Sequence, residues 1–301
     1  EHTPLTALRL GELIMEAGFP AGVVNVVPGP GAIAGEALAA HPDVDKIAFT
    51  GSTPVGKRII AAATGNLKKV TLELGGKSPN VVFADADLDL AIPGAASAIF
   101  FNQGQVCSAG SRLYVEAPVF DEVTQAIAEK ARTMKVGPGI DPTTEMGPLV
   151  AKEQLDRVWG YLESGYAQGA RALTGGQKID GPGHFIQPTV LVDTTPDMKV
   201  VREEIFGPVV TVHPFSKDSD VMPVANASIY GLGSGIWTKD LSKAHRMAAQ
   251  MHAGTVWVNC YNIFDAALPF GGYKQSGWGR EMGHEVLNAY TQVKSVCMNL
   301  S

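Results

Sequence analysis

The chain has 301 residues, and because a typical domain has about 150, this length favours two domains. Hydrophobic residues make up 45% and charged residues 18%, which excludes a disordered chain and supplies a sizeable core. The net charge of −6 leaves no basic excess to neutralise phosphates, so nucleic acid is not an expected partner. Three cysteines are too few for a disulfide scaffold, and apolar runs such as 92–101 are too short to span a bilayer, so no membrane association is expected.

Helical and strand-like patterns alternate along the first hundred residues. Helical patterns cover 4–18, 31–40, 54–64 and 88–102. Strand patterns cover 23–27, 46–50, 70–74 and 80–83. Alternation of this kind predicts an α/β fold with a parallel sheet covered by helices.

The alternation continues in the second half of the chain. Further helical patterns cover 120–135, 153–168, 218–227 and 241–251, and further strand patterns cover 209–215 and 254–259. The tail 293–300 is apolar and strand-like, with nothing after it to pair with. A change of character at Gly75-Gly76 is the best candidate for a domain boundary.

Two glycine-containing turns are candidate cofactor loops. The segment 29–34 fits the G-x-G-x-x-G/A dinucleotide pattern, but no acid ends the next strand, so we interpret it mainly as a tight turn. The segment 49–56 (FTGSTPVG) joins a strand to a helix with Pro54 near its start. Free N–H groups at a helix N-terminus bind anions, although simple capping by Ser52 or Thr53 is an open alternative.

Two side chains stand out as candidates for catalysis. Glu73 lies between two leucines at a strand end, where apolar walls raise a carboxyl pKa and suit a general base; an ion pair with Lys77 is the alternative. Cys107 follows a helix end at Gly104 and precedes small residues that leave room for a substrate. Since a lone cysteine is usually inert, its position alone leaves the role open, whereas Cys260 and Cys297 have the pattern of packing residues.

Metal chemistry and common hydrolase or nucleotide motifs are not indicated. The seven histidines have no ligand-like spacing, so no metal site is expected. Neither a G-x-S-x-G elbow nor a G-x-x-x-x-G-K-[ST] loop occurs. The acids Glu203 and Glu204 belong either to an ordinary turn or to a ribose contact.

Taken together, five strings resemble the NAD(P)-dependent aldehyde dehydrogenase superfamily, in its order and at its spacing. They are FTGSTPVG at 49–56, LELGGKSP at 72–79, FFNQGQVCSAGSR at 100–112, EEIFGPV at 203–209 and PFGGYKQSGWGRE at 269–281. The resemblance covers essentially the whole chain. Broad-specificity members and those acting on phenylacetaldehyde or betaine aldehyde are the most similar.

The resemblance implies a role for each matching residue. Cys107 corresponds to the catalytic nucleophile, with its backbone N–H as an oxyanion donor, and Glu73 to the general base. Glu1 corresponds to an acid on the adenosine ribose that repels a 2′-phosphate, which favours NAD over NADP as cofactor. The remaining cofactor positions are Gly51, Ser52, Thr53, Val55 and Gly56 on the pyrophosphate side, Leu74 and Gly75, Gln154 and Glu204 at ribose, and Phe206 beside the ring.

The implied reaction oxidises an aldehyde to a carboxylic acid. A thiolate forms a thiohemiacetal and then a thioester, which water hydrolyses with help from Glu73. CoA-acylating and acyl phosphate relatives lack that base, so Glu73 disfavours both. The alternative from another class is a structural, crystallin-like protein on the same fold, for which an intact Cys107 and Glu73 are unnecessary.

The substrate positions implied by the family are largely aromatic. They are Phe101, Val106, Ser108, Phe264, Asp265 and Phe270. The phenylalanines favour an apolar aldehyde such as an arylacetaldehyde, while Asp265 leaves room for a cation such as betaine aldehyde. Lys and Arg do not occur at these positions, which disfavours semialdehydes that carry a carboxylate.

The resemblance also implies a domain plan. Residues 1–74 form the second half of a partial Rossmann-like NAD-binding domain, 75–276 an α/β catalytic domain, 277–292 a return to the cofactor domain, and 293–301 an oligomerisation strand of a homodimer or homotetramer. Family chains have a long segment before this start, with a cofactor lysine and an oxyanion asparagine. We therefore expect a fragment that is inactive alone, from a protein that is cytoplasmic because no targeting segment is visible.

Overall fold

The computed structural model describes residues 1–300, which divide into two compact units. The first unit contains 1–49 and 54–70, and the second contains 50–53 and 71–301. The sequence places the main boundary at 74/75, close to the division at 70/71.

The first unit is mainly helical. It holds α1 (Leu5–Glu16), a π-helical turn (Gly31–Gly35), α2 (Glu36–Ala40) and most of β1 (Lys46–Thr50) and α3 (Thr53–Ala63). The buried Lys68 ammonium donates to the Ala39 and His41 carbonyls at 2.7 Å, which satisfies acceptors at the end of α2.

Much of the apolar surface of this unit is exposed. No residue of α1 is buried. The large exposed hydrophobic side chains of the unit are Leu5, Leu8, Leu10, Leu13, Met15, Phe19, Val23, Val24, Val26, Val27, Ile33, Leu38, Val55 and Leu67. The predicted strand at 23–27 is wrong: these residues form no strand in the part of the chain that the structure describes. A strand needs a hydrogen-bonded neighbour, and an apolar run without one stays irregular.

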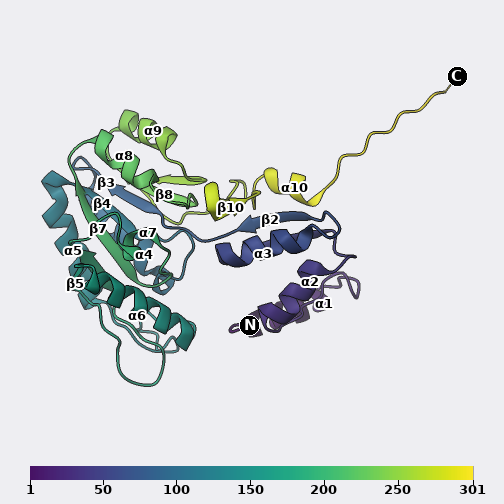
Figure 1. The fold of residues 1–301 in the computed structure, drawn as a ribbon, viewed down its shortest axis with the longest axis horizontal. Coiled ribbons are helices and arrows are strands. Elements are labelled where there is room, and N and C mark those ends of the chain that lie inside the picture. Colours follow the sequence, from purple (N-terminus) through teal and green to yellow (C-terminus); the bar gives the residue numbers. More distant parts are fainter. Residues whose placement is uncertain (301) are drawn as a thin grey trace. The chain divides into compact units, whose positions relative to one another are not determined.

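The second unit is built on a seven-stranded sheet with the order β5-β6-β7-β4-β3-β8-β9 (Figure 1). Its strands are β3 (Pro79–Val82), β4 (Arg112–Glu116), β5 (Arg171–Thr174), β6 (Thr189–Val192), β7 (Val209–Phe215), β8 (Gly233–Trp237) and β9 (Thr255–Val258). All neighbouring pairs are parallel except β5 and β6. The predicted parallel, helix-covered sheet is therefore confirmed.

Helices cover both faces of this sheet, and alternate strand residues point to opposite faces. On one face, α4 (Leu88–Phe100) and α5 (Phe120–Thr133) pack over Val82, Val115 and other inward side chains. On the other face, α8 (Asp218–Asn226) and α9 (Leu241–Gln250) pack over Val81, Tyr114 and Ile236. A third apolar cluster joins α6 (Lys152–Ala167) and α7 (Lys199–Arg202) to β6 and β7. The sheet thereby becomes the rigid base for the loops at its edge.

A short antiparallel pairing joins β2 (Lys69–Glu73) to β10 (Gly277–Trp278), with Glu73 opposite Gly277 and Leu72 opposite Trp278. A Cβ at Gly277 would lie 1.9 Å from the Leu72 carbonyl oxygen, so only glycine fits there. The chain then forms α10 (Glu285–Tyr290) and continues to residue 300 without helix or strand. The strand expected at 293–301 thus stays a prediction, and Ser301 lies outside the described residues.

Candidate active site

The loop that carries Cys107 follows α4 through a tight turn. Asn102, Gln103 and Gly104 all have left-handed backbones, with φ of 49°, 57° and 66°. A left-handed backbone costs conformational free energy in residues other than glycine. Consecutive residues of this kind therefore occur where the surrounding structure enforces them. A Cβ at Gly104 would lie 2.1 Å from the Gly207 carbonyl oxygen, so this loop packs tightly against the segment after Glu204.

Two glycines at the end of β2 bring the acidic and thiol-bearing segments together. A Cβ at Gly75 would lie 2.3 Å from Glu204 Oε2, and one at Gly76 would lie 2.2 Å from the Cys107 carbonyl oxygen. The Gly76 N–H donates to Glu204 Oε1 at 3.0 Å. The Leu-Glu-Leu-Gly-Gly motif therefore lets Glu204 and the Cys107 backbone approach the strand that ends in Glu73.

Glu73 is buried and 7% exposed. Its pKa is raised to about 8, first by burial and then by the negative charge of Glu281, while Arg280 opposes the shift. Among residues 1–300, neither Glu73 Oε2 nor Lys77 Nζ has a hydrogen-bond partner, so the alternative pairing of these two residues is wrong. A carboxyl group with this pKa gains and loses a proton near neutral pH, as a general base requires.

The Cys107 thiol is half-buried and normally protonated. Burial, followed by the negative charges of Glu204 and Glu73, raises its pKa to about 11. Because the thiolate is the nucleophilic form, Cys107 needs a nearby group to accept its proton. The Glu204 and Glu73 carboxylates lie close enough to Cys107 for their charges to act on its pKa.

A crevice of about 560 Å³ opens over Cys107 and Glu204. It is lined by Thr50, Gly51, Ser52, Leu74, Gly75, Asn102, Gln105, Val106, Cys107, Gln154, Arg157, Glu204 and Phe206. This size falls within the range of cofactor and ligand pockets. Glu73 is not among the residues that line the crevice, but nine other residues predicted from the sequence are: Gly51, Ser52, Leu74, Gly75, Val106, Cys107, Gln154, Glu204 and Phe206.

Helix α6 fixes the acidic wall of the crevice. Gln154 Nε2 donates to the Phe206 and Ile205 carbonyls at 2.6 and 3.2 Å, and Arg157 Nη2 donates to the Glu204 carbonyl at 2.7 Å. Phe206 has a left-handed backbone with φ of 58°. Sequence reasoning missed Arg157, although its position one turn after Gln154 on a helix was a usable signal.

The other predicted cofactor residues have separate settings. The Gly51 N–H donates to the Glu73 carbonyl at 3.0 Å, and the Thr53 hydroxyl donates to the Gln275 carbonyl at 3.0 Å. Within the first unit, Val55 is exposed and Gly56 is buried. Glu1 is exposed and its carboxylate lies near Gly31, where an added Cβ would be 3.7 Å from Glu1 Oε2.

Two of the predicted substrate residues, Phe264 and Phe270, contact each other, and three others have different surroundings. Phe264 makes edge contacts with Phe270 and Trp257, at centroid distances of 5.3 and 5.6 Å. Phe101 is 63% exposed, and Asp265 accepts from the Ala267 N–H in its own turn. Ser108 is fully buried and donates to Asn262, so its hydroxyl is engaged within the protein.

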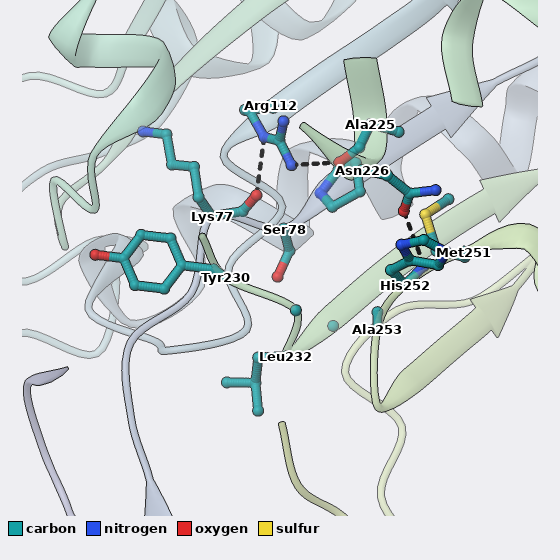
Figure 2. Close-up of a pocket in the computed structure, with 13 residues that line it drawn as sticks. Lys77, Ser78, Arg112, Ala225, Asn226, Tyr230, Leu232, Met251, His252 and Ala253 are labelled. Carbon is teal, nitrogen blue, oxygen red and sulfur yellow. Dashed lines mark hydrogen bonds between the residues drawn. The ribbon is translucent and has the colours of Figure 1, made fainter. Parts of the chain in front are cut away.

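Two buried basic residues, Lys77 and Arg112, line a small pocket (Figure 2). The Arg112 guanidinium donates to the Lys77 carbonyl and to the Ala225 carbonyl, each at 2.8 Å. Lys77 is 2% exposed, and burial followed by the charge of Arg112 lowers its pKa to about 7. Neither residue was identified from the sequence as part of the framework behind Gly76.

Residues 1–300 offer neither a cluster of metal ligands nor a membrane-spanning helix. No group of three or more His, Cys, Asp or Glu side chains is arranged to hold a metal ion. No helix in this part of the chain has the length and apolar character needed to cross a membrane.

Comparison with known proteins gives matches along the whole chain. The chain is 54% identical over 300 residues to the aldehyde dehydrogenase homologue DhaS of Bacillus subtilis (strain 168). This match covers 100% of the chain and 61% of that protein. The chain is also 52% identical over 297 residues to the mitochondrial aldehyde dehydrogenase of Leishmania tarentolae, covering 98% of this chain and 60% of that protein. The chain therefore spans about three fifths of the length of these relatives.

Solved structures match the fold equally well. The NAD⁺ complex of aldehyde dehydrogenase from Bacillus cereus matches with a TM-score of 0.98 and 51% identity, over 99% of this chain and 61% of that one. Betaine aldehyde dehydrogenase from Staphylococcus aureus, in complex with NAD⁺, matches with a TM-score of 0.93 and 42% identity, over 96% of this chain and 58% of that one. The family model described as "Aldehyde dehydrogenase family" matches residues 1–296, and the chain belongs to this family.

Proposed function

We propose that the complete protein oxidises an aldehyde to a carboxylic acid with NAD, using Cys107 as nucleophile and Glu73 as general base. The observation that carries this proposal is the convergence at Gly75 and Gly76, which packs Glu204 and the Cys107 backbone against the end of the strand that holds Glu73. Each of the three acidic groups has a pKa raised by burial. A group of neighbouring side chains with shifted pKa values is typical of an active site.

The crevice fits NAD in two respects. Glu204 offers a carboxylate at its wall, where the hydroxyls of a ribose are suitable donors, and Gly51 and Ser52 offer a turn for a phosphate group. NAD, when bound, supplies the hydride acceptor. The two relatives with solved NAD⁺ complexes support this choice of cofactor.

The residues of this chain divide the work between two stages. In the first, Cys107 loses its proton and its sulfur bonds to the aldehyde carbon, while its own backbone N–H donates to the developing oxyanion. The C–H bond of the former aldehyde carbon then breaks, and its hydride would leave to bound NAD, so that the acyl group remains on sulfur as a thioester. In the second stage, Glu73 takes a proton from the attacking water. The carboxylic acid leaves and the Cys107 sulfur is released. Burial of Glu73 keeps its pKa high enough for this proton transfer.

The preferred aldehyde is apolar or aromatic, such as an arylacetaldehyde. The edge-to-face contacts of Phe264 with Phe270 and Trp257 support an apolar wall, and Val106 packs against the same core. The turn at Asp265 keeps a carboxylate nearby, so a cationic aldehyde is the competing substrate to include in any assay.

We propose two features of the complete protein. The first is a further segment that packs on the first unit, and the second is assembly into a homodimer or homotetramer. The exposed apolar side chains of α1 and the following loop support the first point, since surfaces of this kind are normally covered. The greater length of the relatives supports it as well. The exposed apolar tail supports the second point.

The test compares the complete protein with its Cys107→Ala variant. The wild type should form NADH from phenylacetaldehyde and NAD, and the variant should bind NAD with unchanged affinity but form no NADH, because it cannot make the covalent bond to the substrate carbon. Cys260→Ala is the matched control, since it removes a different half-buried thiol. Turnover by the Cys107 variant above a trace would exclude the assignment.

A further inference from the structure

The segment after β9 holds the nucleophile loop by two hydrogen bonds. The Tyr261 hydroxyl donates to the Ser108 carbonyl at 2.8 Å, and the Ser108 hydroxyl donates to Asn262 Oδ1 at 3.1 Å. Both bonds end on the residue that follows Cys107, although their partners lie more than 150 positions later in the sequence, at separations of 153 and 154. The two bonds fix both the backbone and the side chain of Ser108.

Ser108 and Tyr261 are both buried, so breaking either hydrogen bond costs free energy. Ser108 is 0% exposed and Tyr261 is 9% exposed. A buried carbonyl or hydroxyl that loses its partner carries its full desolvation cost, so the loop has few alternative arrangements. Burial also raises the Tyr261 pKa above its usual range, which keeps the phenol protonated as a donor.

The holding segment is itself fixed. The Tyr261 ring packs on Trp257 with centroids 4.8 Å apart, and a Cβ at Gly235 would lie 2.7 Å from Tyr261 Cδ2, so β8 makes room for this ring. Asn262 has a left-handed backbone with φ of 55°, a conformation that asparagine tolerates better than most residues. The aromatic ring and the turn together aim both donor and acceptor at Ser108.

The opposite side of the nucleophile is fixed at Gly76. The Cys107 carbonyl packs against the Gly76 backbone, where an added Cβ would be 2.2 Å away. The peptide between Cys107 and Ser108 therefore lies between the end of β2 and the segment after β9. Neither of these two supports comes from the nucleophile loop itself.

We propose that Tyr261 and Asn262 are positioning residues that hold the Cys107–Ser108 segment, so that the thiol and the Cys107 N–H face the substrate carbonyl together. The inference rests on the proposed role of Cys107. Because the same segment leads directly into Phe264, it also links the aromatic substrate wall to the nucleophile.

The test uses Tyr261→Phe, which removes the donor and keeps the ring, in the complete protein. Its matched control is Tyr166→Phe, which removes a hydroxyl that donates to the Gly176 carbonyl at 3.0 Å elsewhere in the same unit. We expect kcat/KM for the aldehyde to fall about tenfold or more, because small displacements of reacting groups are costly. The KM for NAD should stay unchanged, since the cofactor wall is not altered.

A second measurement tests the position of the nucleophile loop and does not depend on catalytic turnover. The rate of Cys107 alkylation by iodoacetamide, followed on its own peptide by mass spectrometry, should rise at least about threefold in Tyr261→Phe, because a loosened thiol is better hydrated and ionises more easily. The Tyr166→Phe control should match the wild type. Slower turnover combined with faster alkylation, in a variant whose thermal unfolding is unchanged, is not expected from a general loss of stability.

The Ser108–Asn262 bond is tested by a double-mutant cycle. Asn262→Gly removes the acceptor and suits the left-handed backbone, and Ser108→Ala removes the donor. The double variant should lose no more activity than the more affected single variant. If Tyr261→Phe equals its control in both turnover and alkylation, or if the two single losses simply add, the positioning role is overturned. An inactive wild type would instead exclude the proposed function, while the alkylation rates would still decide on the positioning role.

Discussion

Gly75 lies so close to Glu204 that a Cβ at position 75 would be 2.3 Å from Glu204 Oε2 and 2.8 Å from its Cδ. The Glu204 carboxylate is half-buried and accepts from the Gly76 N–H, so it has little freedom to withdraw. The close approach of these two residues defines one wall of the crevice.

Gly75→Ala should therefore displace Glu204 and weaken cofactor binding in the complete protein. We expect the KM for NAD to rise about tenfold, corresponding to about 1.4 kcal/mol of lost binding energy, with kcat changed less. Gly160→Ala is the control, since an added Cβ there meets nothing within 4 Å. Equal KM values for the two variants would contradict the role of Glu204.

Glu73→Gln should separate the two chemical stages. The amide keeps the shape of the side chain but cannot accept a proton, so thioester hydrolysis should slow by about a hundredfold or more. A pre-steady-state burst of NADH formation, measured by stopped flow, should persist and be followed by slow turnover. Steady-state turnover at the wild-type rate would remove Glu73 from the mechanism.

The contributions of sequence and structure differ residue by residue. Cys107 and Glu73 were identified from the sequence, because their motifs are short and local and occur at the family spacing. The bond between Tyr261 and Ser108 joins residues 153 positions apart, and no local pattern predicts such a pair. Strand β8 was also missed, because its Gly-Ser-Gly-Ile-Trp sequence has neither alternation nor β-branched runs. Its glycines leave space for the rings of Trp257 and Tyr261, which only the tertiary structure places beside them.

The acidic wall shows a further limit of sequence reasoning. The family resemblance gives Gln154 as a ribose contact, but in this structure its amide donates to the Ile205 and Phe206 carbonyls. A sequence motif identifies a position and not the direction of its side chain. The tertiary contacts of α6 determine which acceptor that side chain reaches.

The pH dependence of turnover should follow the ionisation of Glu73. Its pKa is raised to about 8 by burial and by Glu281, and the charged form is the active base, so kcat should increase as the pH rises through about 8. The same shift lowers stability with rising pH, because the folded chain binds more protons than the unfolded one between the ordinary glutamate pKa of 4.5 and about 8. Thermal unfolding of Glu73→Gln should lose this part of the pH dependence, and a kcat profile that is flat from pH 7 to 9 would contradict the prediction.

Cofactor choice should follow the charge of Glu1. A carboxylate facing the adenosine ribose repels a 2′-phosphate, so the complete protein should have a higher kcat/KM for NAD than for NADP. Glu1→Gln should narrow this ratio by raising activity with NADP, whereas Glu12→Gln, at an exposed position of α1 paired with Arg9, should leave it unchanged. Equal kcat/KM values for the two cofactors in the wild type would contradict the assignment.

The tail is the segment that we expect to join subunits. Val293, Val296, Met298 and Leu300 are between 69% and 100% exposed, and residues 291–300 form no helix or strand in the chain alone. An extended apolar segment outside helix and strand pairs readily with the edge of another sheet. The alternative is that the tail folds back on its own subunit.

Deleting residues 293–301 should shift the complete protein toward monomer in sedimentation velocity and lower its thermal stability, because assembly and folding share their free energy. A finer pair of variants separates apolar pairing from charge. The double variant Val296→Asp with Met298→Asp should dissociate the oligomer, since it places two carboxylates in an apolar contact. Lys294→Asp changes the net charge of the tail by the same amount but removes no apolar side chain, so it should leave the oligomer intact. An unchanged sedimentation coefficient after the deletion would exclude the tail as the interface and favour the folded-back arrangement.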